Sequence, residues 1–574
     1  MRKRMAPRWA VVLLSMCLLP WPSAAQSINP SSAPYWVFLR DKRAMQLNPQ
    51  QYFTAPAQLR RQRQHLPAAD STDFPVRPDY VQALRSTVDS VTSVSRWFNA
   101  VACWATPAQI AQVRRLPGVR EVVARYNATP DLLPARRKAA VAAEPLSEED
   151  LQLARRQTSA LGSPALHQAQ LNGHGMRIAI FDVGFRGVDA HPAFQKLLKG
   201  HQITDTWDFI RQKPQVYAYG DHGTEVLSCL AGQFNDSTSL GLAPAAEYLL
   251  ARTEREHSER YSEEEAWLAA VEWADKHGAD IINSSLGYTD RRYFREQMDG
   301  RTSLVARAAA LAVRKGMLVV CSAGNDGDNQ SWGVIGTPAD NDSVLAVGGL
   351  DPATWLPVDF TSRGPTAKRR LKPNVAAFGI AITARPAGGF ERNEGTSFSS
   401  PLVAGFAACI WQRQRGLTAM QLFQQIEKSA TLYPYFDYAQ GYGSPQAAYF
   451  LRPHEQATRP TFDFVRQENG LLQLILRPEA SAQPAQTLPL QLDEPNRPLA
   501  ALPPLPLNAK TSLPLAAPAY VYLHVADARG VLRRYEVREV TQRYVASWAL
   551  STLQPGDQVR ASYKGYTQAY TVSQ

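Results

Sequence analysis

Polar side chains that could catalyse acyl transfer stand at the ends of apolar segments in this sequence. Asp182 ends the run RIAIFD, and His222 lies in YGDHGTEVLSCLAG at the start of an apolar helical pattern. Asn325 follows LVVCSAG, and Ser397 follows Glu-Gly-Thr. Singly, each has an ordinary explanation as a helix cap, a turn residue or a satisfied buried group. Jointly, Asp, His and Ser in this order on an α/β scaffold match one of the known triad arrangements.

The segment around Ser397 predicts a nucleophile at the start of a buried helix. Gly395 permits a tight turn, and Pro401 suits the first turn of a helix. Apolar residues recur at helical spacing from Pro401 to about Arg415, where Gly416 ends the pattern. At such a helix start, backbone N–H groups and the helix dipole favour negative charge.

The elements that must position these residues alternate between strand and helix from about residue 150 to 452. MRIAIFD, ADIINSSLG and MLVVCSAGN read as apolar strands, and SLVARAAALAVRK reads as a helix. Ser262 and Glu265 predict a capping box that opens another helix. The alternation predicts a parallel sheet covered on both faces, whose sites gather at the carboxyl ends of the strands.

Several motifs in order identify the family that this region resembles. IAIFDVGFRGVDAHPAF, DHGTEVLSCLAG, VVCSAGNDG and EGTSFSSPLVAG resemble the aspartate, histidine, oxyanion and nucleophile motifs of subtilisin-like serine proteases. The resemblance implies a triad of Asp182, His222 and Ser397, with Asn325 and the Ser397 N–H binding the oxyanion. All four residues are present, which argues against the alternative of a catalytically silent relative that only binds peptides. Esterase or peptide-ligating activity on the same residues stays open.

The resemblance also implies where a substrate binds. Ser285, Leu286 and Gly287 are expected to pair as a strand with the substrate backbone. Ala323-Gly324 is expected to form one wall of the main specificity pocket, and Gly336 its floor. Such a pocket accepts large apolar or aromatic side chains.

The segments on either side of this region predict further domains. We expect a propeptide and linker over 26–145, a catalytic domain over 146–454 and a β-rich C-terminal domain over 455–574. Residues 34–125 resemble the small α+β, ferredoxin-like inhibitory propeptide of the family, which implies an intramolecular inhibitor and cleavage within 126–150. A permanent N-terminal binding domain is the alternative. The tail loosely resembles C-terminal sorting domains of exported Bacteroidetes proteins; a β-sandwich that aids folding or substrate docking is the other reading.

The start of the chain and its charge distribution predict an exported protein. Residues 1–25 have the basic start, the short apolar run and the Ser23-Ala24-Ala25 site of a signal peptide. No later run is long enough to predict a transmembrane anchor. The formal charge of the chain is +11, but from residue 141 onward 42 Lys and Arg stand against 44 Asp and Glu. Nucleic acid is therefore excluded as a partner, and we expect a secreted or cell-surface monomer that acts on proteins or peptides.

Cysteine spacing and acidic clusters say little about cofactors. Cys103, Cys229, Cys321 and Cys409 lie in apolar surroundings without metal-ligand spacing, so they predict buried thiols. Calcium is possible as a structural ion by resemblance to the family, and 325–330 is the one weak candidate.

Overall fold

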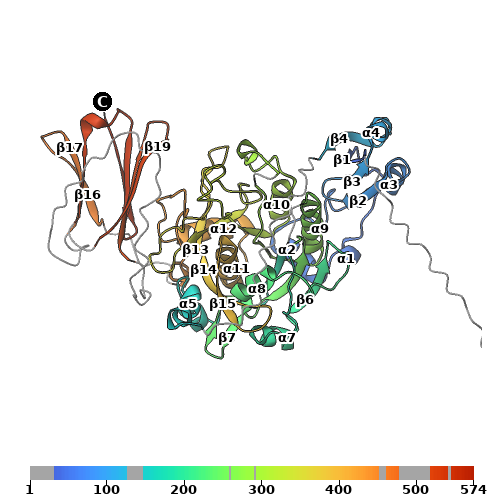
Figure 1. Ribbon diagram of the computed structural model, residues 1–574, viewed down its shortest axis with the longest axis horizontal. Helices are drawn as coiled ribbons and strands as arrows, with labels where there is room; N and C mark the ends of the chain where they lie inside the picture. Colours follow the sequence, from blue (N-terminus) through green and yellow to red (C-terminus); the bar gives the residue numbers. More distant parts are fainter. Residues whose placement is uncertain are drawn as a thin grey trace, which may run out of the picture.

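The computed structural model describes residues 31–125, 146–256, 260–289, 292–451, 460–477, 518–540 and 544–573. Within these ranges, a small N-terminal α+β unit precedes a large α/β unit, and a β-rich unit follows it (Figure 1). The expected signal peptide lies outside the described residues, as do nearly all of the expected linker and the proline-rich part of the tail.

The α/β unit is built on one parallel sheet, as the alternation of strands and helices predicts. Its strand order is β13-β12-β11-β10-β5-β9-β6, and every neighbouring pair is parallel. The seven strands are β5 (Arg177–Asp182), β6 (Ile203–Asp208), β9 (Glu247–Arg252), β10 (Ile281–Ser284), β11 (Leu318–Ser322), β12 (Leu345–Leu350) and β13 (Val375–Phe378).

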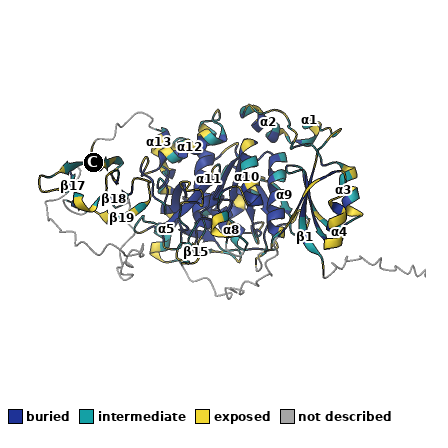
Figure 2. Ribbon diagram, turned by 90° about the horizontal axis from the view of Figure 1, so that it is seen from above, coloured by how far each residue is buried: buried dark blue, intermediate teal, exposed yellow. Residues whose placement is uncertain are grey.

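Two helical layers cover the sheet because its strands are apolar on both faces. Ile178 and Ile180 of β5 pack into a core with α8 (His222–Ala231), α11 (Thr396–Arg413) and α12 (Ala419–Ser429). Ala179 and Phe181 pack into the opposite core with α9 (Ser262–Lys276) and α10 (Leu304–Arg314). Figure 2 shows α11 and the strands beside it as the most buried part of the molecule. The predicted three-layer architecture is confirmed.

Shorter elements complete this unit. They are α5 (Glu148–Ser159), α6 (Ser163–Gln168), α7 (Gln195–Lys199), α13 (Ala447–Leu451), the 3-10 turns η1 (Pro192–Phe194) and η2 (Arg295–Gln297), and the antiparallel pairs β7 (Gln233–Asn235) with β8 (Thr238–Ser239) and β14 (Ile380–Ala384) with β15 (Phe390–Glu394).

Two local sequence predictions in this unit are wrong. The N-cap of α9 is Tyr261 and its side chain makes no capping bond, so the predicted capping box is absent. The Glu265 carboxylate instead pairs with Arg125 and accepts a hydrogen bond from Thr92. The nucleophile helix α11 begins at Thr396, five residues before the predicted start at Pro401.

The N-terminal unit has a four-stranded antiparallel sheet in the order β2-β3-β1-β4, with two helices in the order β-α-β-β-α-β. That is the expected ferredoxin-like arrangement. Trp36, Phe38 and Trp97 project from it into the core formed with α9 and α10. The elements are β1 (Ala33–Leu39), α3 (Pro78–Arg85), β2 (Ser90–Ser95), β3 (Ala100–Ala105), α4 (Pro107–Val113) and β4 (Val119–Ala124).

An insertion between β1 and α3 was not predicted. It contains two short helices, α1 (Pro49–Tyr52) and α2 (Ala55–Arg63), and it contacts the α/β unit rather than its own sheet alone. We call residues 48–73 the arm.

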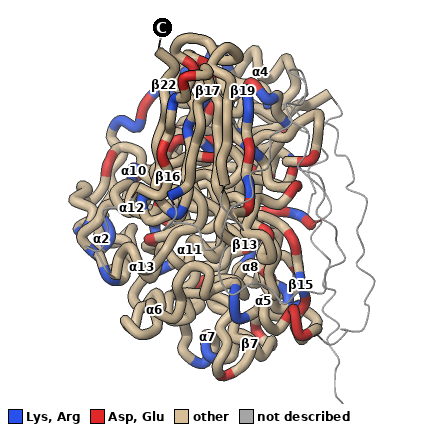
Figure 3. Tube along the Cα trace, turned by 90° about the vertical axis from the view of Figure 1, so that its left-hand side faces the viewer, with Lys and Arg blue, Asp and Glu red and all other residues tan. Residues whose placement is uncertain are grey.

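The C-terminal unit is a sandwich of two antiparallel sheets, β16-β17-β20 and β19-β18-β21-β22, whose apolar faces form one core. The all-β prediction is confirmed. Of its strands, β19 carries several basic and acidic residues, whereas β17 carries none (Figure 3). The strands are β16 (Phe462–Arg466), β17 (Leu471–Leu476), β18 (Tyr520–Ala526), β19 (Leu532–Glu539), β20 (Val545–Ala549), β21 (Gln558–Tyr563) and β22 (Tyr566–Thr571). The 3-10 turn η4 (Leu550–Thr552) lies between β20 and β21.

The cysteine prediction is confirmed for the four cysteines in the described ranges, all of which are buried free thiols. Burial raises the pKa of Cys103 to about 11, and that of Cys321 and of Cys409 to about 12. Among the described residues, no helix is both long and apolar enough to span a membrane.

Candidate active site

Asp182 and His222 meet at the carboxyl edge of the sheet. Asp182 is the last residue of β5 and is fully buried, whereas His222 is the first residue of α8 and remains partly exposed. The Nδ1 atom of His222 lies 2.8 Å from Oδ1 of Asp182, and the same oxygen accepts a 2.8 Å hydrogen bond from the Val183 N–H. With Nδ1 bound to a carboxylate, Nε2 is the ring nitrogen available to act as a base.

A glycine permits this contact. A Cβ atom on Gly223 would lie 2.2 Å from the carbonyl oxygen of Gly184 and 3.0 Å from the Cβ of Asp182. Any side chain at this position would therefore push the start of α8 away from the end of β5. The glycine after His222 is a requirement of the close approach between these two elements.

Ser397 lies in the first turn of α11, which packs against α8. Ser397 as a whole residue is 8% exposed, and the ring centre of the next residue, Phe398, lies 5.9 Å from that of His222. The Ser397 hydroxyl lies 3.3 Å from the Ser285 carbonyl oxygen. Pro401 has no N–H to donate to the Ser397 carbonyl four residues earlier, and the Ser285 hydroxyl donates to that oxygen instead, at 2.8 Å. The hydrogen bond from Ser285, which directly follows β10, thus replaces the helical hydrogen bond that Pro401 cannot donate.

Asn325 faces the turn that precedes Ser397. Its Oδ1 accepts hydrogen bonds from the backbone N–H and the hydroxyl of Thr396, both at 2.9 Å. These bonds hold Oδ1 towards Thr396, and Nδ2, the donor group of the amide, is the one that can bind an oxyanion. This group lies 3.5 Å from the position of a Cβ on Gly395, so it is directed along the start of α11.

The residues expected to bind a substrate lie beside this centre. Gly287 is exposed, and a Cβ on it would meet only the Thr337 carbonyl oxygen, 3.9 Å away, so its backbone borders open space. Tyr288 exchanges backbone hydrogen bonds with Thr337, which joins this edge to the segment that contains Gly336. Leu286 is half-buried and Ser285 is buried.

The expected pocket residues differ in which of their atoms can line a pocket. Ala323 is fully buried, and its methyl group packs in the core below the sheet, so only its backbone can line a pocket. Gly324 adopts a φ of +107° and exchanges bonds of 3.2–3.3 Å with the Thr396 hydroxyl. A Cβ on Gly336 would meet Thr289 at 2.9 Å.

Sequence reasoning missed the residues that position the centre. Asn283 accepts a hydrogen bond from Ser400 at 2.8 Å and donates one to Ser285 at 3.2 Å, which ties β10 to α11. Thr396 directly precedes Ser397 in the motif EGTSFSS, and the sequence analysis gave it no role. Its hydroxyl is the feature of the motif that could have indicated a positioning residue. For calcium, the described residues contain no group of three or more His, Cys, Asp or Glu side chains placed to hold a metal.

Comparison with known proteins identifies the family of the α/β unit. The model of the "Subtilase family" matches residues 173–443. Subtilisin of Bacillus pumilus is 30% identical over 297 residues, which cover 50% of this chain and 96% of that protein. The chain belongs to the subtilase family. Subtilisin E of Bacillus subtilis (strain 168) is also 30% identical, over 50% of this chain and 70% of its own.

The predicted family, the fold class and the enzyme class are thereby confirmed: this subtilase is a subtilisin-like serine protease. A second family model, the "Peptidase S8 propeptide domain, Bacteroidota", matches residues 34–141. The subtilase is therefore a protease made as a zymogen with an intramolecular inhibitor. A solved structure of the prenylagaramide maturation protease PagA is similar at 26% identity and a TM-score of 0.41, over 51% of this chain and 97% of its own.

Proposed function

We propose that this subtilase is an exported endopeptidase in which Ser397, His222 and Asp182 form the catalytic triad. The observation that carries the proposal is the 2.8 Å contact between His222 Nδ1 and Asp182, made at the start of a helix that packs against the helix of Ser397. The proposed domains are a propeptide and linker over 26–145, a catalytic domain over 146–454 and a C-terminal domain over 455–574. Export is inferred from the character of residues 1–25 alone.

In this mechanism His222 takes the proton of the Ser397 hydroxyl through Nε2 as the oxygen attacks the carbonyl carbon of the substrate. Asp182 holds the ring in the required tautomer and stabilises the imidazolium. The Asn325 Nδ2 group and the Ser397 N–H bind the oxyanion. His222 then returns the proton to the leaving amine, and water hydrolyses the acyl-enzyme by the same route in reverse.

For substrate binding we propose main-chain pairing with Ser285, Leu286 and Gly287, which the exposed backbone of Gly287 supports. The backbone of Ala323-Gly324 and the segment at Gly336 are proposed to border the main specificity pocket. The lack of acidic residues among these six positions favours apolar or aromatic side chains over Lys or Arg.

The test is expression of residues 26–574 with Ser397 intact, as Ser397→Ala, and as Ser399→Ala, followed by intact mass and casein hydrolysis. Ser399 is the matched control because its hydroxyl points away to the Phe378 carbonyl oxygen. We expect the first and third proteins to lose roughly the 115–125 residues that precede the catalytic domain and to digest casein. Ser397→Ala is expected to stay full length and inactive.

A peptide-binding protein without catalysis is the competing function. It is favoured if the wild type stays full length and, after activation by trypsin, still cleaves nothing while it binds peptides. Cleavage by Ser397→Ala at the wild-type rate would refute the proposed nucleophile.

A further inference from the structure

A second contact between the propeptide and the catalytic domain lies away from the substrate edge and is made by a segment outside the four-stranded inhibitory sheet β2-β3-β1-β4. The arm, residues 48–73, wraps the C-terminal ends of α9 and α10. These ends lie at the amino edge of the parallel sheet, since Asp280 directly precedes β10 and its carboxylate accepts a bond from the Arg177 N–H at the start of β5. The triad lies at the opposite edge.

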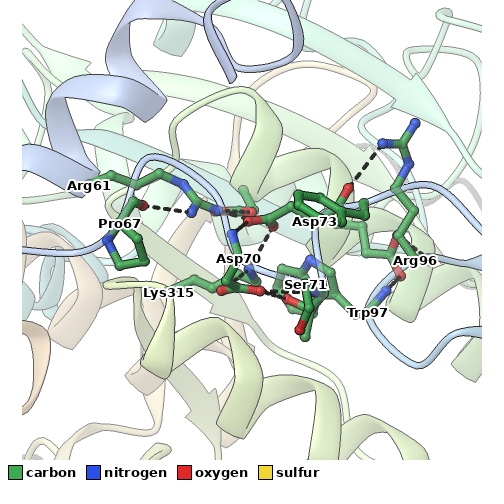
Figure 4. Close-up of polar contacts among 12 residues, drawn as sticks. Arg61, Pro67, Asp70, Ser71, Asp73, Arg96, Trp97 and Lys315 are labelled. Carbon is green, nitrogen blue, oxygen red and sulfur yellow. Dashed lines mark hydrogen bonds and ion pairs between the residues drawn. The ribbon is translucent and has the colours of Figure 1, made fainter. Parts of the chain in front are cut away.

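Buried charges hold the arm in place. Arg61 lies 3.0 Å from Asp275 of α9 and 3.2 Å from Asp73 of the arm itself, and Arg60 also pairs with Asp275. Lys315, which follows α10, lies 2.6 Å from Asp73 and 3.0 Å from Asp70 (Figure 4). Among these residues, only Asp70 has a side chain more than 3% exposed.

The arm also satisfies the backbone at the end of α9. Thr54 donates to the Lys276 carbonyl oxygen from both its N–H and its hydroxyl, at 3.1 and 3.2 Å. Arg60 donates to the carbonyl oxygens of Asp275 and Ala279. These are carbonyls at the negative end of a helix dipole, where guanidinium groups are favoured. The C-terminal end of α9, with Asp275, is thus complementary in charge to the adjacent Arg60 and Arg61 of the arm.

The two partners fit closely in shape. A Cβ on Gly278 would lie 2.5 Å from the Ala57 backbone nitrogen, and one on Gly316 would lie 2.7 Å from the Gln64 side chain. Gln64 then bridges to the segment before α12, donating to the Leu417 carbonyl oxygen and accepting from the Ala419 N–H, both at 3.1 Å.

One more cation orders the base of the arm. The Lys42 ammonium has three N–H donors and lies 2.7–2.9 Å from four backbone carbonyl oxygens, three in the returning segment 71–74 and one at Arg96 of the β2–β3 turn. These contacts connect the arm to the inhibitory sheet. When the sheet dissociates from the catalytic domain, the arm must therefore dissociate as well.

We propose that the C-terminal ends of α9 and α10 form a second binding surface for the propeptide, distinct from the substrate edge, and that the arm's Arg60-Arg61 pair is its ligand. The role of this surface in regulating the protease rests on the proposed function, a protease made as a zymogen. Cleavage in the linker after β4 leaves the arm untouched, because β4 ends near the N-terminus of α9, where Arg125 meets Glu265, and the arm binds the other end of that helix. The arm therefore prolongs inhibition after processing.

The experiment uses the full chain with Ser397→Ala, so that it needs no catalysis, and a site for an unrelated sequence-specific protease placed within 127–144. The protein is immobilised by a C-terminal tag and cut, and loss of the propeptide into a continuous wash is followed by intact mass. Arg60→Ala/Arg61→Ala is compared with Arg114→Ala/Arg115→Ala, which removes the same charge from exposed positions of the propeptide. Asp275→Asn is the third variant, changed on the catalytic side, and near-UV circular dichroism checks folding.

We expect the arm variant to release the propeptide at least about 30-fold faster than the parent, since losing one partner of a buried charge pair acts on dissociation. The exposed double variant is expected to match the parent, and Asp275→Asn to release faster as well. Equal release rates in all four proteins would overturn the proposal. If the arm variant misfolds, Asp275→Asn decides alone. Because none of these readouts needs the triad, failure here is distinguishable from failure of the proposed protease activity.

Discussion

At the scale of single residues, Thr396 controls which end of the Asn325 amide is available. Its N–H and hydroxyl both donate to Oδ1, which fixes the direction of the Nδ2 donor, and the same hydroxyl also contacts Gly324. The side chain touches no reacting atom in this arrangement. Thr396 is therefore a positioning residue for the proposed oxyanion site.

We predict that Asn325→Ala lowers kcat roughly 10²–10³-fold, a range established for the corresponding asparagine of subtilisin, a relative of this protein. Thr396→Val should lower kcat by a smaller factor, about 10-fold, because the backbone N–H of residue 396 still orients the amide. Steady-state kinetics on a peptide substrate would check both, with KM little changed. Asn329→Ala, in the same loop, is the control; an equal loss there would mean that the loop rather than the amide matters.

At the scale of elements, the site depends on how closely α8 approaches β5. We predict that Gly223→Ala lowers activity by 10²-fold or more while the chain still folds, because the new methyl group overlaps the Gly184 carbonyl and displaces His222 from Asp182. Activity assays beside far-UV circular dichroism would measure this.

The matched control is Gly405→Ala in the middle of α11. A methyl group there meets its nearest neighbour, Leu242, at an ordinary contact distance of 3.4 Å. Activity should persist, and helix stability should rise by up to about 1 kcal/mol. Retention of full activity by Gly223→Ala would show that the two elements can separate without harm.

At the scale of the whole molecule, the C-terminal sandwich docks on the catalytic domain around a buried histidine. The His524 ring of β18 lies 4.7 Å from that of Tyr435, and Arg560 binds both His524 Nδ1, at 3.2 Å, and the Phe436 carbonyl oxygen, at 3.0 Å. Burial, with the Arg560 guanidinium second, lowers the pKa of His524 from 6.5 to about 3. Its neutral form is the one compatible with docking.

We predict that docking stability is complete above pH 6.5 and falls as the pH drops towards 3, by about 1.4 kcal/mol per unit, because the undocked histidine gains a proton that the docked one excludes. Asp437, whose pKa burial raises, acts in the opposite direction. Thermal unfolding of Ser397→Ala at pH 7 and pH 5, with and without His524→Gln, isolates the histidine. Equal pH dependence in both proteins would contradict the prediction.

Much of this protein followed from local pattern. The local features are an apolar strand that ends in Asp182, another that ends shortly before Asn325, a histidine that opens an apolar helix and a serine after Glu-Gly-Thr. Their order along the chain is enough to identify the family. Such signals survive in the sequence because the edge of a parallel sheet collects whatever follows its strands. The start of α11 was misplaced by five residues because a proline is read as a first-turn signal, whereas here the Ser285 hydroxyl compensates for it.

Other features were decided only by the tertiary structure. Arg60 and Asp275 are 215 residues apart in the chain, and nothing near either residue indicates the other. The Thr396–Asn325 and Asn283–Ser400 bonds likewise join separate elements. Pairings of this kind depend on which folded elements meet. The burial of the apolar faces of helices and sheets decides that, rather than the individual residues in contact there.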